Sequence, residues 1–315
     1  VHLGFPALGI GRSWAGKCHG PKHSERRLKR PLIARLNADF DEGRLAKPGA
    51  GAQIGPMIDR VRLEEIVREA GRIALGRWPG HGHVLESWEK DPGSPVSEAD
   101  LAVDLFLKRE LAALLPAAGW LSEETIDAPE RLEGGLLWLV DPIDGTRDFI
   151  RGRPGWAVSV ALVSSGRPLL GLLCAPARDE LWSAEAGQGS WRNGVKLAAS
   201  RRADFSGARV PADTLPKSDL DLVPVARPNS IALRIAMVAA DEADLVATLR
   251  WGFEWDIGAA ALIAREAGAA VSDAFGQPLN YNKRDPRDFG VLVSAPGIHA
   301  AAVERLAERA RALAG

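Results

Sequence analysis

Apolar residues recur at helical spacing in three stretches of the chain. Residues 58–75 show the mixed faces of an amphipathic helix, and apolar side chains return every three or four positions across residues 103–114. Ser97 and Asp100 match a capping box, so we expect the second helix to begin there. Residues 256–268 are rich in alanine, and Gly268 predicts the end of a third helix.

Short apolar runs with turn residues between them fill the middle of the chain. Runs separated by clusters such as Ser164-Ser-Gly-Arg-Pro168 are typical of an antiparallel meander. The predicted strands cover residues 136–140, 157–163, 169–174 and 180–184. A further strand is expected near residues 269–271, and residues 81–89 are expected to form a loop. The mixture indicates layered sheets and helices.

Composition narrows the class of protein. The 315 residues are 46% hydrophobic, with 40 basic and 41 acidic side chains, which allows a large core in one extended domain or two lobes. The balanced charge indicates no nucleic-acid polymer as a partner. The longest apolar runs fall short of the roughly 20 residues that a membrane-spanning helix needs. Cys18 and Cys174 share no metal or redox spacing, which favours a cytoplasmic protein.

The first 56 residues are rich in glycine, proline, arginine and lysine and lack sustained periodicity. We expect them to be mostly disordered. The scarcity of acidic residues before Asp39 leaves a transit peptide open, although no amphipathic helix is visible there. Met57 stands immediately before the first helical pattern, which favours an upstream extension.

Two carboxylates follow the apolar run 136–140, in the segment Asp141-Pro-Ile-Asp144-Gly-Thr146. Hard divalent cations such as Mg²⁺ prefer oxygen ligands, and two carboxylates across a proline-set turn can converge on neighbouring ions. Gly145 permits a close backbone approach, and Thr146 offers a hydroxyl and the amides of a helix start, which suit a phosphate. An Asx turn that serves only backbone geometry explains the same residues.

Other acidic residues stand at the ends of predicted elements. Glu123 and Glu124 follow an apparent strand, where two buried acids would require a cation nearby, or else both face water. Asp256 and Asp100 stand at helix starts, where a carboxylate could simply cap the amides. No histidine lies near these acids in the sequence, and neither cysteine begins a phosphate-binding loop. Zinc, phosphohistidine and cysteine chemistry are therefore disfavoured, which leaves aspartate and a metal.

Three motifs together resemble the inositol monophosphatase superfamily: Ser122-Glu-Glu124, Asp141-Pro-Ile-Asp144-Gly-Thr146 and Trp255-Asp256-Ile-Gly-Ala-Ala. The resemblance runs from about Met57 to the C-terminus. It implies an α+β fold, a layered αβαβα sandwich. An N-terminal lobe, residues 57–200, would carry an antiparallel sheet and most metal ligands, and residues 201–315 would form a smaller α/β lobe. The active site would lie between the lobes, and homodimers are common among such proteins.

The resemblance also implies a role for each matching residue. Mg²⁺ would be bound by Glu123, Asp141, the Ile143 carbonyl, Asp144 and Asp256. Asp100 and Thr146 would orient the attacking water, aided by Glu123. Metal ions can activate that water and neutralise phosphoryl oxygens, so an in-line displacement needs no protein nucleophile.

Substrate contacts are implied for a second group of residues. The amides of Gly145 and Thr146 would hold the phosphate, beside Asp144 and Asp256. Ser230, Arg234 or Arg250 would meet the remainder of a small phosphate monoester, although ordinary surface charge explains both arginines equally well.

Several segments look closer to the bacterial 3'(2'),5'-bisphosphate nucleotidase branch, among them Leu279-Asn-Tyr-Asn-Lys283. Two segments depart from it: Asn229-Ser-Ile-Ala-Leu-Arg234 matches that branch only loosely, and Leu249-Arg-Trp-Gly-Phe-Glu254 fits neither branch. The expected reaction is hydrolysis of adenosine 3',5'-bisphosphate to AMP and phosphate, with lithium inhibition. An inositol 1-phosphate, sugar phosphate or histidinol phosphate phosphatase is the alternative.

Two rival hypotheses remain open. An aspartyl-phosphate phosphatase has a similar motif, but one residue separates its aspartates, and two separate Asp141 from Asp144. A catalytically silent sensor of phosphate metabolites could use the same fold. The complete set of acidic positions in this chain favours an enzyme over the sensor.

Overall fold

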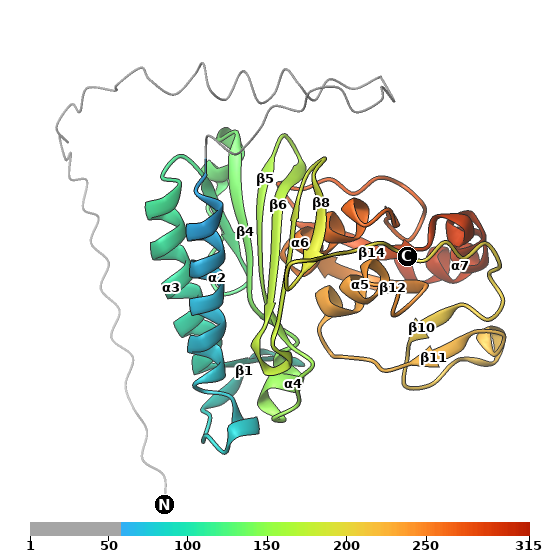
Figure 1. Ribbon diagram of the computed structural model, residues 1–315, viewed down its shortest axis with the longest axis horizontal. Coiled ribbons are helices and arrows are strands. Elements are labelled where there is room, and N and C mark those ends of the chain that lie inside the picture. The colour runs from blue at the N-terminus through green and yellow to red at the C-terminus, as the bar shows by residue number, and fades with distance from the viewer. Residues whose placement is uncertain (1–57) are drawn as a thin grey trace, which may run out of the picture.

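The structure, a computed structural model, describes residues 58–315; the expected disorder of residues 1–56 lies outside the described residues. Two helices cover one face of a large sheet (Figure 1): α2 (Arg60–Leu75) and α3 (Glu98–Leu114). The predicted capping box is confirmed, because the Ser97 backbone N–H and Oγ both donate to Asp100 Oδ2, at 2.8 and 2.6 Å. Capping thus fixes Asp100 at the first turn of α3.

Seven strands form the large sheet, in the order β3-β4-β5-β6-β7-β8-β9. They are β3 (Gly119–Ser122), β4 (Leu136–Asp144), β5 (Ala157–Ser164), β6 (Arg167–Ala175), β7 (Glu180–Glu185), β8 (Gly189–Arg192) and β9 (Val195–Lys196). The predicted antiparallel meander is confirmed from β4 onward, whereas β3 pairs with β4 in parallel. Both faces of β4 and β5 are buried, so these strands appear in the sequence as continuous apolar runs.

The second face of this sheet packs against α5 (Ile231–Ala239) and α6 (Glu254–Glu266). Beyond them lies the antiparallel sheet β12-β14-β13, with β12 (Leu245–Phe253), β13 (Ala270–Ser272) and β14 (Arg287–Ser294). Helix α7 (His299–Ala314) covers its outer side. The layers run helix, sheet, helix, sheet, helix in Figure 1, which confirms the αβαβα sandwich.

The predicted third helix occurs as α6, which begins two residues earlier than expected and ends at Glu266. Gly268 follows with a φ of 91°, the left-handed geometry that commonly closes a helix. The residues 200–228 that look like a connection contain the small parallel pair β10 (Arg209–Pro211) and β11 (Val223–Val225). The lobe boundary near residue 200 stays a prediction, since α5 and α6 form the layer between the two sheets.

One loop prediction was wrong. Residues 81–89 include the start of a hairpin, β1 (Ser87–Asp91) with β2 (Ser94–Ser97), which turns at Gly93 with a φ of 82°. Each strand is too short to show alternation, so the turn residues dominate the pattern. A five-residue helix, α4 (Thr146–Ile150), follows β4.

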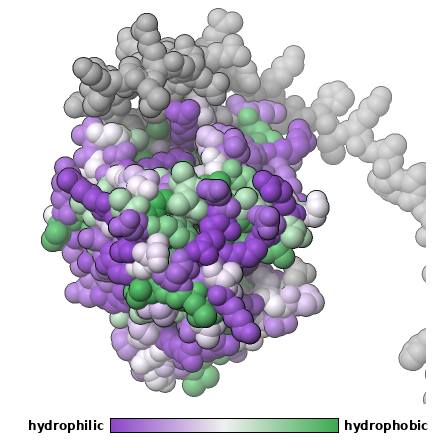
Figure 2. Space-filling view, turned by 90° about the vertical axis from the view of Figure 1, so that its right-hand side faces the viewer, coloured by the Kyte–Doolittle hydropathy of each residue, from purple (hydrophilic) through white to green (hydrophobic). Residues whose placement is uncertain are grey.

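The outer face of the second lobe carries mainly hydrophilic residues interspersed with smaller apolar patches (Figure 2). Among residues 58–315, none of the helices has the length and apolar character needed to cross a bilayer. The larger apolar clusters lie between the layers instead, on both faces of the seven-stranded sheet.

Candidate active site

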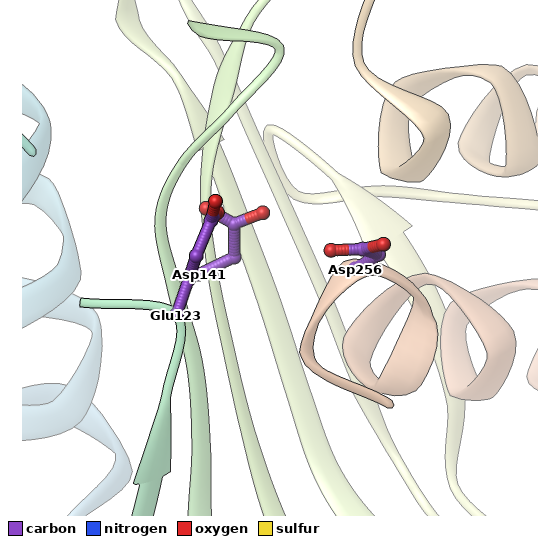
Figure 3. A group of neighbouring side chains, drawn as sticks. All are labelled: Glu123, Asp141 and Asp256. Carbon is purple, nitrogen blue, oxygen red and sulfur yellow. The ribbon is translucent and has the colours of Figure 1, made fainter. Parts of the chain in front are cut away.

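Three acidic side chains from distant parts of the sequence meet at one end of the large sheet. The parallel register of β3 and β4 places Ser122 opposite Val140, so the residues that follow, Glu123 and Asp141, lie side by side. Asp256 faces them from the first turn of α6 (Figure 3). One carboxylate oxygen from each of the three lies within 4.8 Å of the others.

Burial makes this acidic cluster unfavourable without a cation. Asp141 is 2% exposed, and its pKa is raised well above the usual range by burial and then by the charges of Glu123, Asp144 and Asp256. Burial, followed by repulsion from Asp144 and Glu123, raises the pKa of Asp256 to about 8. A divalent cation would remove this repulsion, and an all-oxygen donor set fits Mg²⁺.

Asp144 lies beside these three acids but is held by the start of α5. Its Oδ2 accepts hydrogen bonds from Ser230 Oγ at 2.5 Å and from the Ala232 N–H at 2.7 Å, and its Oδ1 accepts from the Ile231 N–H at 3.3 Å. Burial raises the pKa of Asp144 to about 6, against the lowering effect of these bonds. Asp144 therefore caps α5 and links the end of β4 to that helix beside the three-acid cluster.

The turn from Asp141 to Asp144 is an Asx turn and also supplies a carboxylate to the acidic cluster. Asp141 Oδ1 accepts from the Ile143 N–H at 3.0 Å, as in an Asx turn, while the same carboxyl belongs to the acidic cluster. Gly145 has a φ of 96°, and a Cβ there would lie 2.7 Å from the Gly155 carbonyl oxygen. Only glycine fits this position, so the backbone can turn α4 toward the cavity.

The predicted pair for holding water is also assembled. Thr146 Oγ1 lies 3.0 Å from the Ile143 carbonyl oxygen and 3.4 Å from Asp100 Oδ1. Asp100 is 1% exposed, and burial raises its pKa to about 7 despite the hydrogen bonds from Ser97. A carboxyl with that pKa can exchange a proton near neutral pH.

A cavity of about 400 Å³ is lined by these groups and by four arginines. Arg147 donates to the Gly93 carbonyl oxygen, and the other three, Arg227, Arg234 and Arg250, form the arginine wall of the cavity. Arg234 is 9% exposed, and its guanidinium donates only to the backbone oxygens of Ser230 and Asn229. Burial lowers the pKa of Arg234 to about 10, with Asp144 opposing and the two neighbouring arginines adding to the shift. Arg227 pairs with Asp213 at 2.7 Å, but Arg250 forms no ion pair within residues 58–315.

The expected substrate contacts are therefore only partly reachable. Gly145, Thr146, Arg234 and Arg250 line the cavity, together with Asp144 and Asp256. Ser230 is fully buried, and its hydroxyl is engaged by Asp144 and by the Leu233 N–H. The side chain of Ser230 thus positions Asp144, and we assign it to that role.

Sequence reasoning missed two residues that hold Glu123 and its neighbours. Lys90 Nζ contacts Glu123 Oε1 at 3.1 Å and Glu124 Oε1 at 2.6 Å, and the Glu124 side chain is only 3% exposed. The alternative in which both glutamates face water is therefore wrong, because Glu124 is buried and Glu123 belongs to the acidic cluster. Asp104 accepts hydrogen bonds from Ser122 and Thr125, which secures the end of β3. The signal for Asp104 was its position one helical turn after Asp100.

Comparison with known proteins places this site in a family context. A family model described as the inositol monophosphatase family matches residues 59–313. An inositol-1-monophosphatase of Mesorhizobium japonicum is 35% identical over 234 residues, 68% of this chain and 85% of that protein. The 3'(2'),5'-bisphosphate nucleotidase CysQ of Escherichia coli strain K12 is 31% identical over 240 residues, 73% of this chain and 95% of that protein.

Solved structures of similar proteins have the same fold. A Thermotoga maritima IMPase superposes with a TM-score of 0.69 at 28% identity, covering 81% of this chain and 100% of that one. The relatives thus share one family and fold but are named for different substrates.

Proposed function

The chain belongs to the inositol monophosphatase family and is a magnesium-dependent phosphatase, and we propose that its substrate is adenosine 3',5'-bisphosphate, hydrolysed to AMP and phosphate. The observation that carries this proposal is that Arg227, Arg234 and Arg250 line the same cavity as the acidic cluster. A substrate with one phosphate at the metal site and a second phosphate elsewhere would use both walls of the cavity.

Glu123, Asp141 and Asp256 would hold the metal, with Asp144 and the Ile143 carbonyl completing the donor set. When bound, Mg²⁺ supplies positive charge to the phosphoryl oxygens and lowers the pKa of a coordinated water. The acidic cluster alone would repel a phosphate dianion, so substrate binding requires that the metal neutralise its charge.

The protein's own groups position the reaction. Thr146 and Asp100, with their oxygens 3.4 Å apart, would orient the attacking water, and Asp100 would accept its proton. The backbone N–H groups of Gly145 and Thr146 would hold the transferred phosphate, because they lie at the N-terminal end of α4 beside the acids. Glu123, within the acidic cluster, would help to orient the water.

The second phosphate would bind the arginine wall. Arg234 is buried without a carboxylate ion-pair partner among residues 58–315, and Arg227 and Arg250 raise the local positive charge. An incoming phosphate would satisfy these guanidinium groups with charge-assisted hydrogen bonds. This requirement favours a bisphosphate over inositol 1-phosphate, the second candidate, which the 35% identical Mesorhizobium relative supports.

Phosphate release from a substrate panel tests the proposal. With Mg²⁺ present, kcat/KM should be highest for adenosine 3',5'-bisphosphate, above inositol 1-phosphate, fructose 1,6-bisphosphate and histidinol phosphate. A higher kcat/KM for inositol 1-phosphate would overturn the substrate assignment. We also expect lithium to inhibit the reaction, measured as phosphate release with increasing lithium at fixed magnesium.

A further inference from the structure

The end of β12, residues 250–253, matches neither branch of the family, and only Arg250 has a role so far. β12 pairs with β14, but the register shifts between Thr248 and Trp251. Irregularities of this kind change the direction in which side chains point. Here Arg250 lines the metal cavity, whereas the ring of Trp251 packs edge to face on Phe289 and lines neither that cavity nor the adjoining cleft.

Phe253, the last residue of β12, is fixed beside the acidic cluster. Its backbone N–H donates to Asp256 Oδ2 at 3.2 Å, which ties it to one of the three clustered carboxylates. Its ring stacks on Trp255 with centroids 4.3 Å apart and an interplanar angle of 6°. Trp255 is 9% exposed but Phe253 is 39% exposed, so the Phe253 ring presents an aromatic surface to solvent beside Asp256.

The space beside this aromatic surface adjoins the main cavity. A narrow cleft is lined by Arg250, Gly252, Phe253 and Asp256, and Arg250 and Asp256 also line the main cavity. A Cβ at Gly252 would lie 3.6 Å from Asp256 Oδ2, so a larger side chain there would project toward the carboxylate. Glycine keeps the path from the acidic cluster to the aromatic ring open.

We propose that Phe253 is a specificity-determining residue that stacks against the planar base of a nucleotide substrate whose phosphate lies at the acidic cluster. This inference rests on the proposed nucleotide substrate and adds the group that would recognise its base. Exposed aromatic rings bind bases through their flat faces, and Phe253 is already held flat by Trp255. Arg250 beside it would contact the base edge or a phosphate.

The test compares Phe253→Ala with Trp251→Ala, which removes another exposed aromatic side chain of the same strand, one that lines neither the cleft nor the main cavity. The KM ratio of adenosine 3',5'-bisphosphate to glycerol 2-phosphate, which has no base, should rise about tenfold in Phe253→Ala. Trp251→Ala should keep the wild-type ratio, and Phe253→Trp should restore most of it. Thermal unfolding identifies any variant that fails to fold. A wild-type ratio in folded Phe253→Ala would overturn the inference.

A binding experiment separates this inference from the proposed function. Calorimetric titration with AMP in the presence of Mg²⁺ measures base recognition even if the wild-type enzyme prefers another phosphate ester. AMP affinity about tenfold weaker in Phe253→Ala than in Trp251→Ala would support the aromatic surface. Equal AMP affinity in the two variants, or no AMP binding by the wild type, would contradict it whatever the substrate panel shows.

Discussion

The two walls of the cavity are fixed by the chain in different ways. The acidic wall, Glu123, Asp141 and Asp256, stands at the ends of β3 and within β4 and α6, where strand pairing and helix capping set each backbone. In the arginine wall, Arg227, Arg234 and Arg250, two residues also stand on regular elements, α5 and β12. Among residues 58–315, however, the Arg234 guanidinium is held only by two backbone oxygens and Arg227 by one exposed ion pair. Closely supported carboxylates suit metal chemistry, and the less constrained guanidinium groups suit the choice of substrate.

The largest effect should come from the acidic wall. Asp141→Asn removes a negative charge at the centre of the cluster, so Mg²⁺-dependent phosphate release should fall at least about a thousandfold. Asp204→Asn, an exposed position away from the cavity, is the matched control and should keep wild-type turnover. Phosphate release at the wild-type rate by the Asp141 variant would show that the acidic wall is not needed for the reaction.

A smaller and more selective loss is expected from the arginine wall. Arg234→Gln removes a buried guanidinium and should lower kcat/KM for adenosine 3',5'-bisphosphate by about 10- to 100-fold. The loss for 3'-AMP, which lacks the second phosphate, should be much smaller. Arg287→Gln, outside the cavity, serves as control. Equal losses for the two nucleotides would mean that Arg234 supports the fold or the acids and not the second phosphate.

Loss of the hydrogen bond between Ser230 and Asp144 should have a smaller effect still. Ser230→Ala removes the hydroxyl that donates to Asp144, and loss of such a supporting hydrogen bond should raise the Mg²⁺ concentration for half-maximal rate about tenfold. The exposed Ser206→Ala is the control. The measurement is activity as a function of Mg²⁺ concentration. An unchanged half-saturating concentration in Ser230→Ala would show that Ser230 does not support the metal site.

The smallest effect is a pH dependence of stability in the metal-free protein. Folding raises the pKa of Asp144 to about 6 and of Asp256 to about 8, so the folded state holds protons that the unfolded chain loses above about pH 4. Stability should therefore fall as the pH rises from about 4 to 8. Thermal unfolding in EDTA should show Tm lower at pH 8 than at pH 5 by a few degrees, roughly.

Magnesium and one variant sharpen this measurement. Bound Mg²⁺ favours the carboxylates, so it should raise Tm more at pH 8 than at pH 5. Asp256→Asn should have a weaker pH dependence in EDTA, because it removes the titrating group with the pKa near 8. A metal-free Tm that rises across this range would contradict the buried acidic cluster.

Sequence reasoning found the acidic wall because its residues stand in short motifs at element ends. The run 136–140 identified β4, and the capping pattern at Ser97 placed Asp100. The αβαβα layers were predicted from the family resemblance that these same motifs carry. Local patterns of this kind survive in the sequence because strand burial and helix capping act over a few residues.

The rest of the site depends on contacts between residues far apart in the chain. Ser230 meets Asp144 across 86 positions, and no local pattern records that pairing. Lys90 reaches Glu123 from the hairpin of β1 and β2, whose strands are too short to show alternation in the sequence. Phe253 became visible only when its ring could be placed on Trp255 and beside Asp256.

The most direct test of the central claim is a calorimetric titration of Mg²⁺ into the wild type and Asp141→Asn, performed at pH 7 in two buffers with different ionisation enthalpies. The account predicts that the wild type binds Mg²⁺ and releases protons on binding, because metal binding deprotonates carboxyls whose pKa is raised by burial. Asp141→Asn should bind far more weakly. Equal Mg²⁺ affinity in the two proteins, or binding by the wild type without proton release, would contradict the assignment of the acidic wall as the metal site.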